Sequence, residues 1–181
     1  AHLTTQMTMR LAAAGLALLS LWSWGDPLAS AMSRSQAFGA SPDATLVPIT
    51  TPNGTVIQGE LADTTEKRVR GLMFREHLPS NRGMLFAFPE AQQWTIWMKN
   101  TKIPLDIIWL DHTKAIVHIE RNVPICTRQD EGCPQYQPIK KAMYVLEVAG
   151  GVADRLKLQR GLRLQFELPS SLLGHPPLLS K

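Results

Sequence analysis

The clearest structural signal in the chain is the segment Leu105-Asp106-Ile107-Ile108-Trp109-Leu110, an apolar run that contains one carboxylate. A polar stretch follows, Asp111-His112-Thr113-Lys114, and a second run extends from Ala115 to Glu120. Two short runs of this kind joined by a polar turn predict a β-hairpin.

Further strands are predicted on both sides of this hairpin. An earlier hairpin is expected over 46–61, because Pro52 and Gly54 supply the fixed φ and the positive φ that its turn needs. The remaining predicted strands cover 83–88, 94–98, 142–148 and 162–168. The last of these shows strict apolar and polar alternation, the period of a half-buried strand.

One main helix is predicted after the first hairpin. Asp63 can cap its first amides while Glu66 reaches back, and Pro79 ends it. A short helix is expected over 152–158. With seven to eight short strands and no regular βαβ alternation, we predict an α+β fold, a mostly antiparallel sheet or partly closed barrel with one main helix.

Composition limits the class of protein. The chain has 181 residues, of which 44% are hydrophobic and 19% charged, and its net charge is +4 at pH 7. This length favours one domain, expected over 46–168, and the composition excludes disordered, collagen-like and cysteine-dense chains. The charge is too small and too dispersed to indicate nucleic acid binding. The sequence leaves the oligomeric state open.

The first residues are typical of an export signal. Arg10 precedes the uncharged stretch 11–25, whose length suits a signal-peptide core better than a span of about 20 residues. Cleavage is expected after Ala31 or near Ala40. We therefore expect a signal peptide with its upstream residues over 1–31, a linker over 32–45 and a tail over 169–181. The mature protein would be periplasmic or secreted, without a membrane span; an uncleaved N-terminal anchor is the alternative.

Cys126 and Cys133 are the only two cysteines of the chain. An exported protein meets an oxidising compartment, which favours a disulfide between them. A redox-active pair and half of a metal site are the alternatives, although the spacing suits neither.

Two carboxylates lie within apolar segments. Asp106 interrupts the 105–110 run, and Glu147 interrupts the 142–148 run. A carboxylate placed there is costly when it is desolvated and unpaired, so each should face solvent or meet donors. The candidate ligand-binding residues are these two and the donors expected near them: Arg75, Lys99, Asn100, Thr101, Asp106 and Glu147.

Three interpretations of these residues compete. In the first, Asp106 accepts backbone amides or pairs with a basic side chain and only fixes a loop. In the second, Asp106 and Glu147 converge with Lys99 in a cleft, as acid/base or ligand-orienting groups. A metal site is the third, but we assign no metal, because the histidines show no ligand spacing: His77, His112 and His118.

Two other groups of side chains have both a structural and a functional interpretation. The basic side chains of the main helix form a solvated face or contact an anionic ligand or membrane headgroup: Lys67, Arg68, Arg70 and Arg75. Three tryptophans belong to the core or form a stacking platform: Trp94, Trp97 and Trp109. No motif for a catalytic serine, a phosphate loop, a dinucleotide or zinc is present, so we predict no cofactor.

Several ordered motifs identify a family. They are Gly71-Leu72-Met73-Phe74-Arg75, Gly83-Met84-Leu85-Phe86, Trp97-Met98-Lys99-Asn100-Thr101, Ile103-Pro104-Leu105-Asp106-Ile107, Ala142-Met143-Tyr144-Val145-Leu146-Glu147 and the Cys126…Cys133-Pro134-x-Tyr136 loop. Together they closely resemble the domain of unknown function 192 family (DUF192), also called uncharacterised protein family 0127 (UPF0127), from about Leu46 to Leu168. The resemblance implies a small single-domain α+β fold, often exported in bacteria, and no established activity, cofactor or catalytic residue.

The sequence favours a non-enzymatic envelope module that binds a small-molecule or cell-envelope ligand in a polar cleft beside Lys99 and Asp106. The second hypothesis is a hydrolase or isomerase that uses Asp106 and Glu147 as a carboxylate pair. The third is a structural or protein-interaction module. The sequence leaves open whether the protein is an enzyme, and it favours a non-enzymatic role because no motif for an activated nucleophile is found.

Overall fold

The computed structural model describes residues 44–128 and 132–170. The predicted signal peptide and its cleavage sites lie outside these residues, as do most of the predicted linker and tail. No helix in the described ranges is both long enough and apolar enough to cross a membrane.

The first hairpin forms as predicted. Strand β1 (Leu46–Thr50) pairs antiparallel with β2 (Val56–Ala62). At the turn, the Thr51 amide donates to the Thr55 carbonyl, the Asn53 carboxamide accepts from the Thr51 hydroxyl at 2.6 Å, and Gly54 takes a φ of 84°. A φ of this sign is available to glycine without steric cost, so the residue suits the position.

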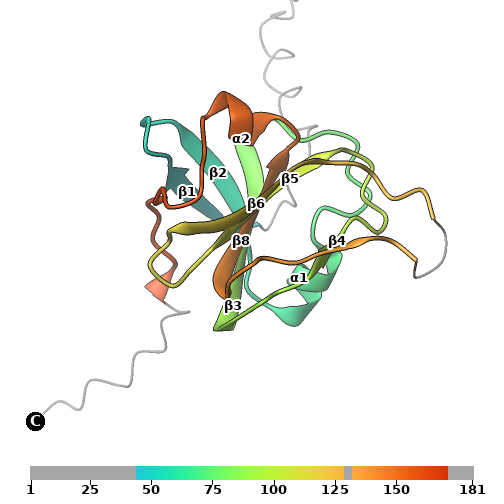
Figure 1. Cartoon of the computed structure of the whole chain (residues 1–181), viewed down its shortest axis with the longest axis horizontal. Coiled ribbons are helices and arrows are strands. Elements are labelled where there is room, and N and C mark those ends of the chain that lie inside the picture. Colours follow the sequence, from blue (N-terminus) through green and yellow to red (C-terminus); the bar gives the residue numbers. More distant parts are fainter. Residues whose placement is uncertain (1–43, 129–131, 171–181) are drawn as a thin grey trace, which may run out of the picture. The chain divides into compact units, whose positions relative to one another are not determined.

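The main sheet contains six strands in the order β1-β2-β3-β8-β5-β6 (Figure 1). The four not yet introduced are β3 (Arg82–Gln92), β5 (Leu105–Leu110), β6 (Ile116–Val123) and β8 (Ala142–Ala149). The predicted hairpin of β5 and β6 is confirmed, and every pairing is antiparallel except that of β2 with β3. The strand order runs from an edge at β1 to an edge at β6, so the sheet is not a closed barrel.

The parallel pair requires a crossover between β2 and β3, and helix α1 (Thr65–Arg70) forms part of it. The helix starts one residue later than predicted, because Thr64 rather than Asp63 accepts the capping bond from the Lys67 amide. It also ends far before Pro79, at Gly71, whose φ of 47° stops the helical backbone.

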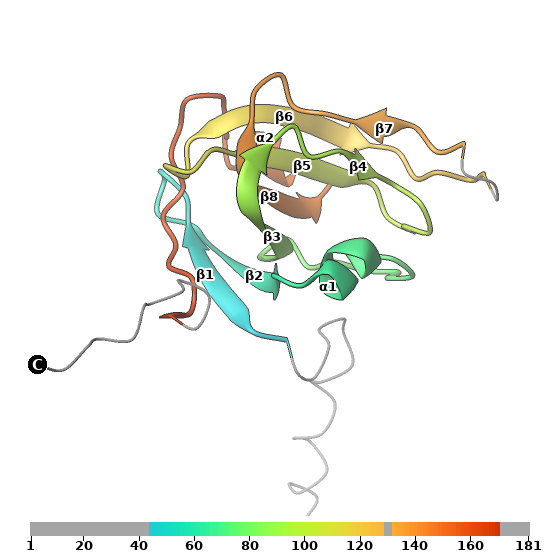
Figure 2. The same ribbon diagram turned by 90° about the horizontal axis from the view of Figure 1, so that it is seen from below.

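Two short elements complete the fold. Strands β4 (Ile96–Trp97) and β7 (Gln135–Tyr136) form a separate two-stranded sheet, and helix α2 (Val152–Arg155) follows β8. Both views show β4 and α1 on the same side of β3 (Figures 1 and 2). That side contains the candidate site.

Two predicted strands differ in the structure. Of the predicted strand over 94–98, only the two residues of β4 are extended and paired. The segment 162–168 is not a strand but makes isolated bridges, Gln165 with Thr50 and Arg163 with Ala115. The apolar and polar alternation has another cause, because Leu164 and Phe166 are buried against the core. The segment crosses the ends of strands and pairs with no strand along its length.

The sheet is covered on both faces. One buried cluster includes Ile49, Leu85, Ile108, Leu146 and Phe166. On the other face, alternate residues of the same strands form a second cluster with Met84, Phe86, Ile107, Trp109 and Val145. Burial on both faces explains the nearly continuous apolar sequence of β5, whose residues are all buried.

Candidate functional site

Asp106 is fully buried and holds three backbone segments together. Its Oδ1 accepts hydrogen bonds from the amides of Asn122 at 2.7 Å and Gly151 at 3.1 Å, and its Oδ2 accepts one from Ala153 at 2.7 Å. These amides belong to the end of β6, the turn after β8 and the first turn of α2. Three charge-assisted bonds stabilise the ionised carboxylate, so the structural interpretation of Asp106 applies.

The predicted carboxylate pair does not form. In the antiparallel register, Asp106 lies opposite Val148, whereas Glu147 lies opposite Ile107. Neighbouring residues of a strand point to opposite faces, so Asp106 faces the cluster around Ile108 and Glu147 faces the other cluster. The expectation that both would meet in one cleft is therefore wrong. The register of β5 with β8 decides the face of each side chain, and the sequence alone does not show this register.

Glu147 lies in a row of residues across the second face of the sheet. The register aligns Glu60 of β2, Met84 of β3 and Glu147 of β8. Both glutamates are buried, with exposed fractions of 3% and 5%. Two carboxylates thus flank one methionine, and their partners differ.

Glu60 is fully compensated. Arg75 donates to both of its carboxylate oxygens at 2.6 Å, a bidentate pair, and Arg82 approaches to 3.5 Å. Arg75 is thereby placed in the interior as the partner of a buried carboxylate and does not project toward solvent. Its predicted role as a ligand-binding residue is at most indirect.

Glu147 has weaker compensation. Burial raises its pKa to about 8, and the charge of Arg75 opposes this increase only in part. At neutral pH the protonated form therefore predominates, and this form carries an O–H donor.

A cavity of about 70 Å³ adjoins this carboxyl group. We call it the Glu147 cavity. Its charged and polar lining comes from α1, the residue before β4, the β4–β5 loop and β8: Arg68, Arg70, Thr95, Lys99, Thr101 and Glu147. Phe86 and Trp97 supply aromatic walls. Lys99 and Thr101 line this cavity together with Glu147, and Asp106 does not.

Two residues with positive φ shape one wall of the cavity. Phe74 has a φ of 64° and Asn100 a φ of 56°, and the Phe74 amide donates to the Asn100 carbonyl at 2.8 Å. This bond fastens the segment after α1 to the β4–β5 loop. The Asn100 side chain is exposed and lies 3.9 Å from the Met73 sulfur, so Asn100 shapes the loop without lining the cavity.

Lys99 and Arg68 are held by aromatic rings. The Lys99 ammonium lies 5.0 Å from the centre of the Trp97 ring, and the Arg68 guanidinium lies 5.5 Å from that of Phe88. Arg68 also donates to the carbonyls of Asp63 at 2.8 Å and Ala87 at 2.9 Å. The basic side chains of α1 are therefore partly engaged in the fold, and the simple interpretation as a solvated helix face does not hold for Arg68.

Sequence reasoning did not include several lining residues among the site candidates. Arg68, Arg70, Gly71 and Met73 line the cavity, although only an anionic contact of the basic cluster was considered beforehand. Glycine is needed at position 71, because a Cβ there would lie 3.3 Å from the Phe86 ring in addition to the positive φ. The crossover between β2 and β3 carries these residues over the second face of the sheet. Its path depends on tertiary contacts, and no local sequence pattern predicts it.

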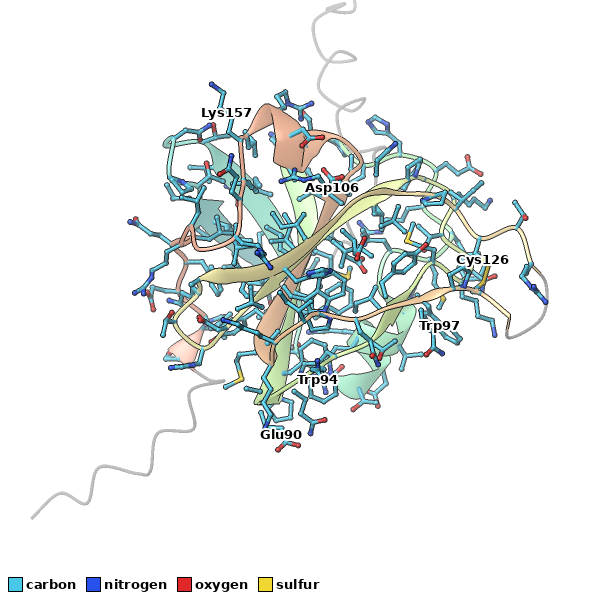
Figure 3. The ribbon with its side chains drawn as sticks, in the orientation of Figure 1. Glu90, Trp94, Trp97, Asp106, Cys126 and Lys157 are labelled. Atoms are coloured by element: carbon cyan, nitrogen blue, oxygen red, sulfur yellow. A yellow bond between two sulfur atoms is a disulfide. The ribbon has the colours of Figure 1, made fainter. Side chains whose placement is uncertain are left out.

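The tryptophans divide between the two interpretations. Trp109 is fully buried, and its indole N–H donates to the Trp94 carbonyl at 2.9 Å, so it belongs to the core. Trp94 and Trp97 are only half-buried, and Figure 3 shows both on the same side of the sheet as the small strand pair.

The cysteines form the predicted disulfide. Cys126 and Cys133 are bonded, with Cα atoms 5.8 Å apart. Within the described ranges, no three His, Cys, Asp or Glu side chains are grouped as metal ligands would be.

Comparison with known sequences places these features in a family. Residues 48–166 match DUF192, whose description is "Uncharacterized ACR". The chain belongs to the DUF192 family. The match covers the main sheet from within β1 onward and the entire Glu147 cavity, so the site described above is part of the family domain.

Curated DUF192 relatives carry the name UPF0127. One from Thermococcus sibiricus is 29% identical over 111 residues, which cover 60% of this chain and 66% of the relative. One from Thermococcus kodakarensis is 29% identical over 104 residues, covering 56% and 60%. The match thus spans less than two thirds of the length of either relative.

Solved structures with a similar fold come from bacteria. A protein of unknown function from Novosphingobium aromaticivorans is 30% identical, with a TM-score of 0.61 and coverage of 72% of this chain and 94% of that one. A protein from Sinorhizobium meliloti is 29% identical, with a TM-score of 0.60 and coverage of 70% and 98%. The description of the latter suggests that it is a transcription regulator. These similarities support the fold of the DUF192 domain.

Proposed function

We propose that this DUF192 domain is a binding module that holds the anionic end of a small ligand in the Glu147 cavity. The observation that carries the proposal is the buried Glu147 side chain, which lines a cavity together with the basic side chains of Arg68, Arg70 and Lys99.

The charges around the cavity favour an anion. Arg68, Arg70 and Lys99 contribute three positive charges to its lining, and Glu147 is mostly neutral at pH 7. A protonated glutamic acid donates a hydrogen bond to an oxyanion, as a neutral carboxylic acid does in some enzyme sites. Thr101, which is buried, adds a hydroxyl donor.

The size of the cavity limits what enters. About 70 Å³ holds a few water-sized groups, whereas a whole drug-sized ligand needs roughly 300–1,000 Å³. A carboxylate or phosphate group fits, and the remainder of the ligand must lie outside. Because a nucleophile is not assembled at the cavity, we propose binding rather than catalysis.

We further propose that the module works after export. The Cys126–Cys133 disulfide supports this location, because such bonds persist mainly in oxidising compartments. The uncharged stretch 11–25 provides the matching sequence signal.

The test is a titration with acetate and with inorganic phosphate, followed by amide chemical shifts and by fluorescence of the half-buried Trp97. We expect saturable shifts at Thr101 and Glu147, and at least fivefold weaker binding in Arg70→Gln, because Arg70 is exposed and its loss leaves the fold intact. Arg155→Gln, the same change at an exposed residue of α2 outside the cavity, is the matched control. Equal binding by the parent and Arg70→Gln, or shifts that avoid the cavity, would contradict the proposal.

A further inference from the structure

A second cavity lies beside the first and shares a wall with it. Its volume is about 420 Å³, within the range of small-molecule sites. The residues that matter here are Arg68, Phe88, Pro89, Met143, Tyr144 and Leu168. Arg68 lines both cavities, so its guanidinium group stands between them.

The lining of the second cavity suits a planar apolar group. Phe88 stacks on Trp94 with ring centres 4.1 Å apart and planes 12° from parallel, and Met143 adds a polarisable side chain. The Arg68 guanidinium faces the Phe88 ring at 5.5 Å. Two hydrogen bonds to carbonyls fix the position of the Arg68 guanidinium group against this ring before a ligand arrives, and such preorganisation lowers the entropic cost of binding.

The two cavities share one face of β3 and β8 in part, because the second also has Ala87, Tyr144 and Leu168 in its lining, which pack on the other face. Phe86 lines the first and Phe88 the second, two residues further along β3 and hence on the same face. On β8, Glu147 and Met143 are four residues apart and also share this face, which at roughly 3.3 Å per residue separates them by about 13 Å.

From this alignment we infer that the ligand is bipartite: a planar apolar group joined by a linker to an anionic group, with the apolar group between Met143 and the edge of Phe88, whose ring faces Trp94 and Arg68 cover, and the anion at Glu147. The inference rests on the proposed function and specifies the ligand class. The linker passes Arg68, whose positive charge lies on the path between the two ends. A compact anion such as phosphate would occupy only one end.

The test uses a graded set of ω-phenylalkanoates, from benzoate to 8-phenyloctanoate, with acetate and octanoate as references. We expect affinity to rise at least tenfold over acetate once the linker allows the ring to reach Phe88, and octanoate to gain less than the phenyl compound of matched length. Met143→Asp should remove this gain and leave acetate binding within twofold. Ile139→Asp, which introduces the same charge at an exposed apolar residue, is the matched control.

The outcomes separate the two proposals. If acetate binds at Glu147 but affinity is independent of linker length, the bipartite ligand is wrong and the anion site stands. If the phenyl compounds gain affinity that Met143→Asp does not reduce, the ring binds elsewhere and the inference fails as well. If no compound shifts the amides of Glu147 and Thr101, the proposed function itself is overturned.

Discussion

Arg75 binds Glu60 through both carboxylate oxygens at 2.6 Å, whereas its charge offsets only part of the effect of burial on the pKa of Glu147. The two glutamates are in register on either side of Met84. Glu60 is paired with Arg75, whereas burial raises the pKa of Glu147 to about 8. The sheet therefore places one residue type in two different environments on the same face.

The stability of the protein should depend on pH through Glu147. Its pKa in the folded state, about 8, lies above its ordinary value of 4.5. Between these values the folded state binds one more proton than the unfolded state, so the stabilisation from Glu147 is complete below about pH 4.5 and is lost as the pH rises to 8, by about 1.4 kcal/mol per pH unit. Urea unfolding of the parent and Glu147→Gln between pH 5 and 9 measures the difference. Parallel stability curves for the two proteins would contradict the assignment.

Anion binding should also depend on the titration of Glu147. A protonated Glu147 donates to the anion, and an ionised one repels it, so acetate affinity should decrease as the pH rises through 8. In Glu147→Gln the carboxamide remains neutral and keeps a donor, so its affinity should be unchanged across this range. Isothermal titration at pH 6.5 and 9 distinguishes the cases. A decrease of equal size in both proteins would assign the pH dependence to another group.

Removal of Arg75 should cost far more stability than removal of a surface cation. Arg75→Met leaves the buried carboxylate of Glu60 without its bidentate partner, and breaking a buried pair from one side costs about 3–5 kcal/mol. Lys102→Met breaks an exposed pair with Glu76 and should cost less than about 1 kcal/mol. Urea denaturation compares the two variants. Equal losses would show that Arg75 is not the essential partner of Glu60.

Asp106 should matter for stability and not for binding. Asp106→Asn keeps the shape of the side chain but places an amide N–H₂ group against backbone donors, so we expect a loss of about 2–4 kcal/mol. Faster hydrogen exchange should appear at Ala153 and Asn122. Acetate affinity of the folded variant should stay within twofold of the parent. A clear loss of acetate binding in a variant that is still folded would show that Asp106 contributes to the binding site.

The disulfide gives the last prediction. In protein that has not met reductant, intact mass should be lower by two hydrogens than after reduction. The pair Cys126→Ser and Cys133→Ser should lower stability by about 2.5 kcal/mol in the chain-entropy account of a loop this short. Labelling of both thiols in the untreated protein would reject the bond.

Local patterns were enough to predict most of the sheet. The hairpins around Gly54 and Asp111, the strand at 142–148 and the disulfide each depend on residues close in sequence. The alternation at 162–168 was misleading, because burial of every second side chain also occurs in an extended segment that crosses the ends of strands. Periodicity reports burial, and it reports strand pairing only when a neighbouring strand is available.

The site could be predicted only in part. The costly placement of Asp106 and Glu147 was visible in the sequence, but their separation onto opposite faces follows from the register of β5 with β8. The approach of Arg68 and Arg70 to Glu147 depends on the path of α1 over the sheet. Both are long-range relationships, and local sequence patterns indicate neighbouring strands only where a short turn joins them.

The carbonyl contacts of Arg68 have a kinetic consequence. Because the guanidinium group joins the start of α1 to β3, the helix and the strand should move as one unit. Entry and release of a ligand would then require movement of the β4–β5 loop, which forms the opposite wall of the cavity. For this movement the hydrogen bond from the Phe74 amide to the Asn100 carbonyl has to break. The residence time of any bound compound would accordingly be governed by the β4–β5 loop, which also carries the lining residues Lys99 and Thr101.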